Sequence, residues 1–246
     1  MAIHAGVNRA RQFALLMSPK CGTRTLNRWF ESTIVEAERT PQWDQRRLGE
    51  RIRDHTVEAK RLADPEFSDF LVIFAVRDPH RRMVSAYLDV VVGRPEEWGQ
   101  ADGAGNVRLD GVSFRTFIET VARLHSEGVM LQHHLQPQVV NVPAGRVDRH
   151  ILTERLEEEL AALSTELGID HSQLGWRGRT RYVDDPNDGG QLVADLPAAA
   201  HSGRIAPRPR RFYDRALYDL VSEVYPDDAA LYRSIPAAWP LEIART

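Results

Sequence analysis

The chain has 246 residues, of which 42% are hydrophobic and 27% are charged, and this composition excludes a fibrous or disordered protein. The formal net charge of −3 argues against a protein that coats nucleic acid, and the single cysteine, Cys21, excludes an intrachain disulfide framework and a cysteine-rich metal site. The sequence contains no apolar run of about 18 residues and no apolar leader, so we expect a cytoplasmic protein without a transmembrane segment, folded as a single domain over residues 1–246.

The first predicted elements are a strand, a tight loop and a helix in direct succession. Phe13–Met17 is a continuous apolar run of strand length, residues 18–22 interrupt it with proline and glycine, and a helix is expected over residues 23–38. The charge-dense stretch 42–62 then predicts a helix on the surface. The turn between the strand and the first helix is the first candidate for a binding site.

This loop has the composition of an anion-binding site. Backbone N–H groups and the positive end of the helix dipole would point at one small volume, and Lys20, Thr23 and Thr25 would add a charge and two hydroxyl groups. The chain has two lysines, Lys20 and Lys60, against 30 arginines, so the composition of the chain does not account for a lysine at this position. The spacing is similar to a P-loop but lacks a lysine directly after the second glycine, since Thr23 follows Gly22. We therefore expect a phosphate or sulfate group here.

The clearest strand, residues 70–76, is apolar throughout, as is typical of a parallel strand buried on both faces. Arg77 follows it, and Asp78 with the next proline predicts a helix that continues to about residue 92. Ligands of open α/β sheets bind at the carboxyl ends of strands, which makes Arg77 a candidate, with Ser85 about two helical turns farther on. A guanidinium group can bind a phosphate through two hydrogen bonds while a hydroxyl group fills a further position. Arg82 is expected to face solvent or to cover apolar surface with its stem.

The remaining chain predicts alternating helices and short strands without an internal repeat. Residues 93–111 and 170–211 are irregular and suit exposed loops that could contact an acceptor. The expected elements are a helix over 114–127 capped by Ser113, a strand over 147–152, a helix over 154–167 that ends at Gly168, and helices over 213–225 and 227–235.

Several motifs together resemble those of one enzyme family. Pro-Lys-Cys-Gly-Thr-Arg-Thr-Leu at residues 19–26 is similar to the 5′-phosphosulfate-binding loop of sulfotransferases that use 3′-phosphoadenosine 5′-phosphosulfate (PAPS). Arg-Asp-Pro-x-x-Arg-x-Val-Ser-Ala-Tyr at residues 77–87 resembles the 3′-phosphate motif of carbohydrate sulfotransferases. The segments His-x-x-Pro-Gln at 134–138, Asp148 to Leu156, and 225–232 resemble later elements of sulfotransferase family 2. The chain is thus identified as a bacterial-like member, without the cysteines and membrane anchor of vertebrate members.

The resemblance implies an α/β class, a three-layer P-loop-like fold with a central parallel sheet flanked by helices. It implies transfer of a sulfuryl group from PAPS to an acceptor hydroxyl group, with release of 3′-phosphoadenosine 5′-phosphate and without a metal ion. The residues implied in donor binding are Pro19, Lys20, Cys21, Gly22, Thr23, Arg24, Thr25, Arg77, Ser85 and Arg204, with Arg208 as the alternative to Arg204.

The implied catalytic residues are Lys20, His134 and Glu31. Lys20 would lie beside the bridging oxygen of the leaving group, where a positive charge neutralises the charge that develops. The general base would be His134, the histidine of the matched element, or Glu31, because related sulfotransferases use a glutamate on the helix after the loop.

Two alternatives remain at this stage: a P-loop-type kinase or NTPase, and a catalytically silent protein of this fold that binds a nucleotide or a glycan. The missing Walker lysine argues against the first, and intact Lys20, Arg77 and Ser85 argue against the second. We expect a small-molecule or glycan acceptor, with a carbohydrate hydroxyl group favoured over a lipid headgroup or a small alcohol, and no nucleic-acid partner. The sequence does not predict an oligomeric state.

Overall fold

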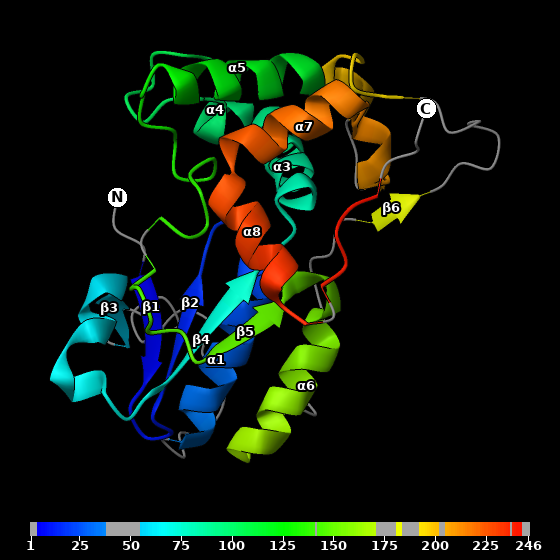
Figure 1. Cartoon of the computed structure of the whole chain (residues 1–246). Coiled ribbons are helices and arrows are strands. Elements are labelled where there is room, and N and C mark those ends of the chain that lie inside the picture. Colours follow the sequence, from blue (N-terminus) through cyan, green and yellow to red (C-terminus); the bar gives the residue numbers. More distant parts are fainter. Residues whose placement is uncertain are drawn as a thin grey trace. The chain divides into compact units, whose positions relative to one another are not determined.

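The computed structural model describes residues 4–37, 55–140, 142–170, 181–183, 192–201, 205–236 and 238–242. The chain divides into two compact units, the first formed by Met1–Val76 with Gln138–Gly178 and the second by Arg77–Pro137 with Arg179–Thr246. Figure 1 shows the helices and strands of both. Each unit has its own hydrophobic core.

The first unit is built on a five-stranded sheet with the strand order β3-β1-β2-β4-β5. Its strands are β1 (His4–Asn8), β2 (Phe13–Met17), β3 (Thr56–Glu58), β4 (Leu71–Val76) and β5 (Arg149–Leu152). Neighbouring strands β2, β4 and β5 are parallel, whereas β1 runs antiparallel to both β2 and β3. The central sheet is therefore mostly, not wholly, parallel (Figure 1).

Helices α1 (Thr23–Ala37) and α6 (Leu156–Leu167) pack on the same face of this sheet. Alternate strand residues such as Phe13, Leu15 and Ile73 point into that core, as the two-residue period of a strand requires. The two helices are also joined by a hydrogen bond, because Trp29 Nε1 donates to Ser164 Oγ over 2.8 Å. Strand residues of the opposite face are buried as well, which explains the uninterrupted apolar runs.

The second unit is mainly helical. Its helices are α3 (Pro79–Tyr87), which continues as a π-helix over Leu88–Gly93, α4 (Pro95–Trp98), α5 (Phe114–Ser126), α7 (Arg215–Val224) and α8 (Pro226–Ser234). Aromatic side chains contribute to its core, with Phe114 in contact with both Tyr87 and Phe212 at centroid separations of 5.4 and 5.2 Å. Strands β6 (Arg181–Val183) and β7 (Ile205–Pro207) form a separate parallel pair.

Short 3₁₀ helices complete the connections. They span Ala59–Ala63, Pro65–Phe67, Thr153–Arg155, Ala198–His201 and Pro209–Phe212. Within the described ranges, no helix is both long enough and apolar enough to span a lipid bilayer.

The predicted α/β class is confirmed, as are the main strands and helices, but several elements differ from expectation. Helix α4 and strands β6 and β7 lie in stretches predicted to be irregular. Strand β1 was not predicted, and the surface helix expected over 42–62 is wrong where it is described, because residues 56–58 form β3 and residues 59–63 a 3₁₀ helix. The rest of that stretch lies outside the described residues. Both strands are short, and β3 pairs with β1, so the pairing of His4 with Glu58 carries information that no local pattern contains.

Candidate active site

The loop after β2 has an unusual backbone conformation. Lys20 and Gly22 both adopt left-handed conformations, with φ values of +69° and +75°. The turn is closed by Cys21 N–H, which donates to Ser18 O over 3.2 Å, and α1 begins with Leu26 N–H donating to Gly22 O over 3.0 Å. The N–H groups of Thr23 and Arg24 at the start of α1 thus have no acceptor within the helix, and they lie at its positive end. This arrangement suits an anionic group.

Gly22 is required here for two separate reasons. Its φ of +75° is costly for other residues, and a Cβ atom at this position would lie 2.8 Å from Leu156 Cδ2. Leu156 is the first residue of α6, so the loop lies close to the start of that helix. The loop therefore has little freedom to accept a side chain at position 22.

We expect Gly22→Ala to lower the free energy of unfolding by about 1–3 kcal/mol, from the strained backbone and the crowded methyl group together. Urea unfolding of the purified variant measures this loss. Gly145→Ala is the matched control, because Gly145 has a φ of +67° in the same unit but open space around its added Cβ. Equal losses in the two variants would show that the Leu156 contact contributes nothing.

Gln138 braces the same loop from a distant part of the sequence. Its backbone oxygen accepts a hydrogen bond from Ser18 Oγ over 3.0 Å, and its Oε1 accepts one from Cys21 Sγ over 2.9 Å. Gln138 and Cys21 are both completely buried. The glutamine of the His-x-x-Pro-Gln element therefore fixes the loop, a role that the sequence motif signals but does not specify.

Arg77 directly follows the carboxyl end of β4. The parallel register pairs Met17 with Ala75, so β2 and β4 end at the same edge of the sheet, and the chain continues from there into Ser18 and Arg77. Arg77 and Ser85 are both partly exposed. Asp78 caps α3 as predicted, because its Oδ1 accepts a hydrogen bond from Arg81 N over 2.9 Å.

Arg82 does not face solvent as expected but is completely buried within the second unit. Its Nη1 donates to His134 O over 3.3 Å and its Nη2 to Gln136 O over 2.8 Å. Nη2 also lies 3.7 Å from a carboxylate oxygen of buried Asp228, and the guanidinium carbon lies 5.1 Å from the centre of the Tyr225 ring. The irregular segment around His134 has carbonyl groups that need donors, which is the physical reason for burying this charge.

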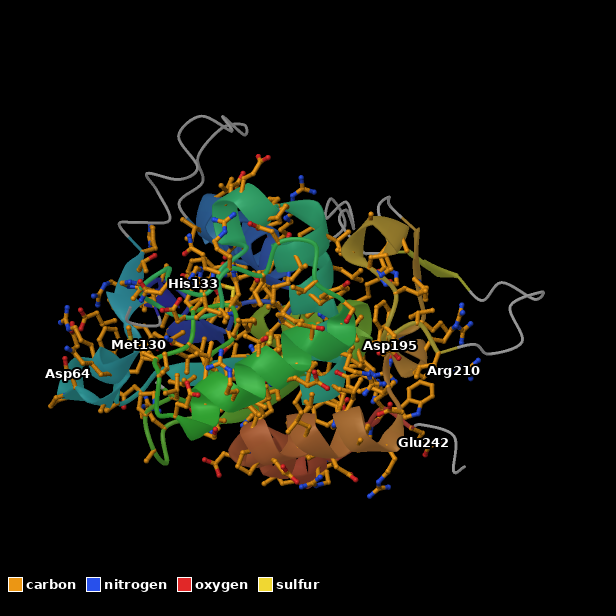
Figure 2. The ribbon with its side chains drawn as sticks, turned by 90° about the horizontal axis from the view of Figure 1, so that it is seen from above. Asp64, Met130, His133, Asp195, Arg210 and Glu242 are labelled. Carbon is orange, nitrogen blue, oxygen red and sulfur yellow. The ribbon has the colours of Figure 1, made fainter. Side chains whose placement is uncertain are left out.

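The side chain of His134 is held by Gln132. Gln132 Oε1 accepts a hydrogen bond from the backbone N–H of His134 over 2.7 Å, while Gln132 Nε2 lies 3.2 Å from His134 Nδ1. The ring of His133, which Figure 2 labels, lies against that of His134 with 4.0 Å between the centroids. Sequence reasoning selected His134 but missed Gln132 and Arg82, which form hydrogen bonds with it.

Glu31 is buried on α1, with 4% of its surface exposed. Its Oε2 has no hydrogen-bond partner among the described residues. Burial raises the pKa of this carboxyl group to about 7, against a smaller lowering effect of Arg28. A carboxyl group that titrates near neutral pH can accept and release a proton there, as a general base must.

This burial also predicts how stability depends on pH. Folded Glu31 keeps its proton to about pH 7, whereas the reference carboxyl group loses it near 4.5, so stability falls as the pH rises between these values. We expect Glu31→Gln, which stays neutral, to match the wild type at pH 5 and to exceed its free energy of unfolding by up to about 3 kcal/mol at pH 8. Urea unfolding between pH 5 and pH 8 measures the difference.

Glu119→Gln, at an exposed position on α5, serves as the control for replacing a glutamate with glutamine. Parallel pH curves for the wild type and Glu31→Gln would contradict the prediction, since they would mean that the carboxyl group titrates alike in the folded and unfolded chains.

The remaining predicted positions are less informative. Arg204 lies outside the described residues, and Arg208 is exposed before the 3₁₀ helix over Pro209–Phe212. In the described part of the chain, no three His, Cys, Asp or Glu side chains gather in a way that could hold a metal ion.

The comparison with protein families decides the identity of this fold. A model of the sulfotransferase family matches residues 4–232. The chain belongs to the sulfotransferase family. The match spans both units and contains the loop at Lys20, the Arg77 motif and the His134 element, so the resemblance found in the sequence is confirmed. Membership supports sulfotransfer as the general activity. Searches of curated proteins and of solved structures gave no match.

Proposed function

We propose that this sulfotransferase transfers a sulfuryl group from PAPS to an acceptor hydroxyl group on a carbohydrate or a glycosylated small molecule. The two units would act as one sulfotransferase domain, since the family match covers both. The carbohydrate acceptor follows from the resemblance of the Arg77 motif to carbohydrate sulfotransferases. Sulfotransferases of this family generally use PAPS, so the family membership supports PAPS as the donor.

The observation that carries the proposal is the loop at residues 18–25. Its left-handed turns at Lys20 and Gly22, and the first N–H groups of α1, which have no acceptor within the helix, suit a phosphosulfate group. We assign the 5′ end of the donor to this loop, namely to Pro19, Lys20, Cys21, Gly22, Thr23, Arg24 and Thr25. Buried Cys21 would act through its backbone and its bond to Gln138.

We assign the 3′-phosphate of the same donor to Arg77 and Ser85. Arg77 follows the end of β4, the strand next to β2, and a guanidinium group can bind a phosphate through two parallel hydrogen bonds. Ser85 on α3 would supply a hydroxyl donor. Arg204 is proposed as a further basic contact on the basis of the sequence alone.

When bound, PAPS supplies the sulfuryl group and a 5′-phosphate leaving group. Lys20 would neutralise the charge that develops on the leaving oxygen, and the N–H groups at the start of α1 would orient the group without moving. The acceptor proton would pass to a general base, His134 or Glu31. The bond from the acceptor oxygen to sulfur forms as the bond from sulfur to the leaving oxygen breaks.

Calorimetric titration with 3′-phosphoadenosine 5′-phosphate in EDTA tests the proposal, beside ATP with magnesium and adenosine 5′-phosphosulfate. We expect metal-free binding that requires the 3′-phosphate. Binding of ATP with magnesium in its place would favour a kinase-like enzyme and overturn the assignment. A screen of carbohydrate acceptors with PAPS then separates an active transferase from a silent binding protein.

A further inference from the structure

A segment after α8 contacts the start of α3, which lies in the same unit. This segment, residues 238–242, is drawn in red in Figure 1 and is called the strap below. Leu241 N–H donates to Asp78 Oδ2 over 3.1 Å, although the two residues are 163 positions apart. Closer to α8, the hydroxyl group of Tyr232 donates to Trp239 O over 3.2 Å and accepts from Trp239 N–H over 3.3 Å. The strap is therefore held at two points, and the side chain of Leu241 is buried in the core of the unit.

Asp78 joins the strap to α3 through its two carboxylate oxygens. Oδ1 caps the helix by accepting from Arg81 N–H over 2.9 Å, while Oδ2 accepts from Leu241 N–H. His80 Nδ1 lies 3.6 Å from Oδ1. Although burial alone would raise it, the pKa of this carboxyl group is lowered overall by His80 and by the N–H groups of Arg81 and Leu241. The buried group is thus an ionised carboxylate that has donors on both oxygens.

The first turn of α3 is also packed against the region of α7. His80 Nε2 donates to Tyr218 O over 3.0 Å, and its ring stacks on that of Tyr218 with 3.7 Å between the centroids. The hydroxyl group of Tyr213 donates to His80 O over 2.9 Å. The strap and α7 therefore both fix the turn that begins at Asp78, and Arg77 is the residue directly before it.

Capping the helix does not by itself require an aspartate at position 78. An asparagine caps helices about as well, but it has one acceptor oxygen where an aspartate has two. The N–H groups of Arg81 and Leu241 both use this side chain as their acceptor. Whichever way an asparagine turned, its NH₂ group would face one of these two donors. The second acceptor oxygen is needed for the strap.

We propose that Asp78 is a positioning residue that, together with the strap, holds Arg77 in the orientation that binds the 3′-phosphate of the donor. This rests on the function proposed above, and it adds residues 238–242 to the parts of the chain that determine recognition of the 3′-phosphate. Two parallel hydrogen bonds to a phosphate require a guanidinium group within a narrow range of orientations. A backbone that is already fixed reduces the conformational freedom lost on binding. Recognition of the 5′-phosphate, assigned to residues 18–25, should not depend on Asp78.

Two nucleotides that differ only in the 3′-phosphate test this proposal. Calorimetry gives the affinity for 3′-phosphoadenosine 5′-phosphate, and displacement gives that for adenosine 5′-phosphate. We expect Asp78→Asn to bind the first about tenfold more weakly and the second unchanged. Partial unfolding would weaken both alike, so the ratio of the affinities isolates the 3′-phosphate. An unchanged ratio in Asp78→Asn would overturn this proposal alone, whereas a wild type without preference for the 3′-phosphate would also overturn the donor assignment.

Asp214→Asn is the matched control, because Asp214 is an N-cap in the same unit that also uses both oxygens. Its Oδ1 accepts from Leu217 N–H over 2.9 Å at the start of α7, and its Oδ2 accepts from Arg115 Nη2 over 2.6 Å. We expect this variant to keep the wild-type ratio of affinities. An equal fall of the ratio in both variants would show that general loosening of the unit, not Asp78, weakens recognition of the 3′-phosphate.

A double variant tests whether Asp78 acts through Arg77. If it does, Asp78→Asn combined with Arg77→Ala binds 3′-phosphoadenosine 5′-phosphate no more weakly than Arg77→Ala alone. Additive losses would overturn the positioning role.

Two variants of Leu241 test the strap separately from the cap. Leu241→Pro removes the N–H group that Asp78 accepts, whereas Leu241→Ala keeps it and removes buried side-chain atoms. We expect the ratio of affinities to fall in Leu241→Pro and to stay at the wild-type value in Leu241→Ala. If Leu241→Pro does not fold, the hydroxy-acid analogue of leucine at position 241 replaces the N–H with an ester oxygen and gives the same readout. A wild-type ratio without this N–H group would overturn the role of the strap.

Discussion

Lys20→Ala is expected to reduce kcat for sulfotransfer by about 10²–10³-fold, the effect of removing one donor aimed at a developing negative charge. The variant should also bind 3′-phosphoadenosine 5′-phosphate about 10–150-fold more weakly, since a lost hydrogen bond to a charged group costs about 1.5–3 kcal/mol. Calorimetry measures the affinity and a PAPS-dependent assay measures the turnover. The left-handed backbone at Lys20 need not change, because alanine meets the same φ penalty as lysine.

The chain offers a matched control in Lys60, its second lysine. Lys60 is 80% exposed and pairs with Glu58 over 2.7 Å in the 3₁₀ helix after β3, so Lys60→Ala removes the same charge from the same unit. We expect Lys60→Ala to retain wild-type affinity and turnover. Unchanged nucleotide affinity in both Lys20→Ala and Arg77→Ala would discard the assignment of the donor site.

The sequence predicts those parts of the fold whose signals are local. The strand at Phe13–Met17 is an unbroken apolar run, Asp78 accepts from the N–H of Arg81 as an N-cap should, and Gly168 ends α6 in the left-handed conformation. Each of these features depends on residues within one or two helical turns. The pairing of β1 with β3 does not, and neither strand was predicted.

The residues of the candidate site also divide into those with a local sequence signal and those without one. The positions of Lys20 and Arg77 follow from the strands that precede them, and these residues were selected from sequence. The supporting residues were not: Gln138 contacts a loop about 120 residues away, and Arg82 was expected at the surface. A buried arginine and an exposed one have the same local sequence pattern. Partners distant in the sequence, here the carbonyl groups of His134 and Gln136 and the carboxylate of Asp228, explain why this one is inside.

Arg82→Met is expected to lower the free energy of unfolding by about 3–5 kcal/mol, because it removes a buried guanidinium group that lies 3.7 Å from the buried carboxylate of Asp228. The carbonyl groups of His134 and Gln136 also lose their donor, so we expect the turnover to fall more than the fraction of folded protein does. Urea unfolding measures the first effect. Arg82→Lys keeps the charge but cannot donate to both carbonyl groups in a fork, and it should recover only part of the stability.

Arg123→Ala is the control for losing an arginine from an ion pair in the same unit. Arg123 pairs with Glu127 on α5 with 53% of its side chain exposed, and we expect its loss to cost less than about 1 kcal/mol. An equally small loss in Arg82→Met would show that burial of the charge does not affect the free energy of unfolding. The double variant Arg82→Met with Asp228→Asn then separates the two contributions, because it removes both charges of the pair but not the need of the two carbonyl groups for a donor. Recovered stability without recovered turnover would mean that the ion pair stabilises the fold while the hydrogen bonds of Arg82 position His134.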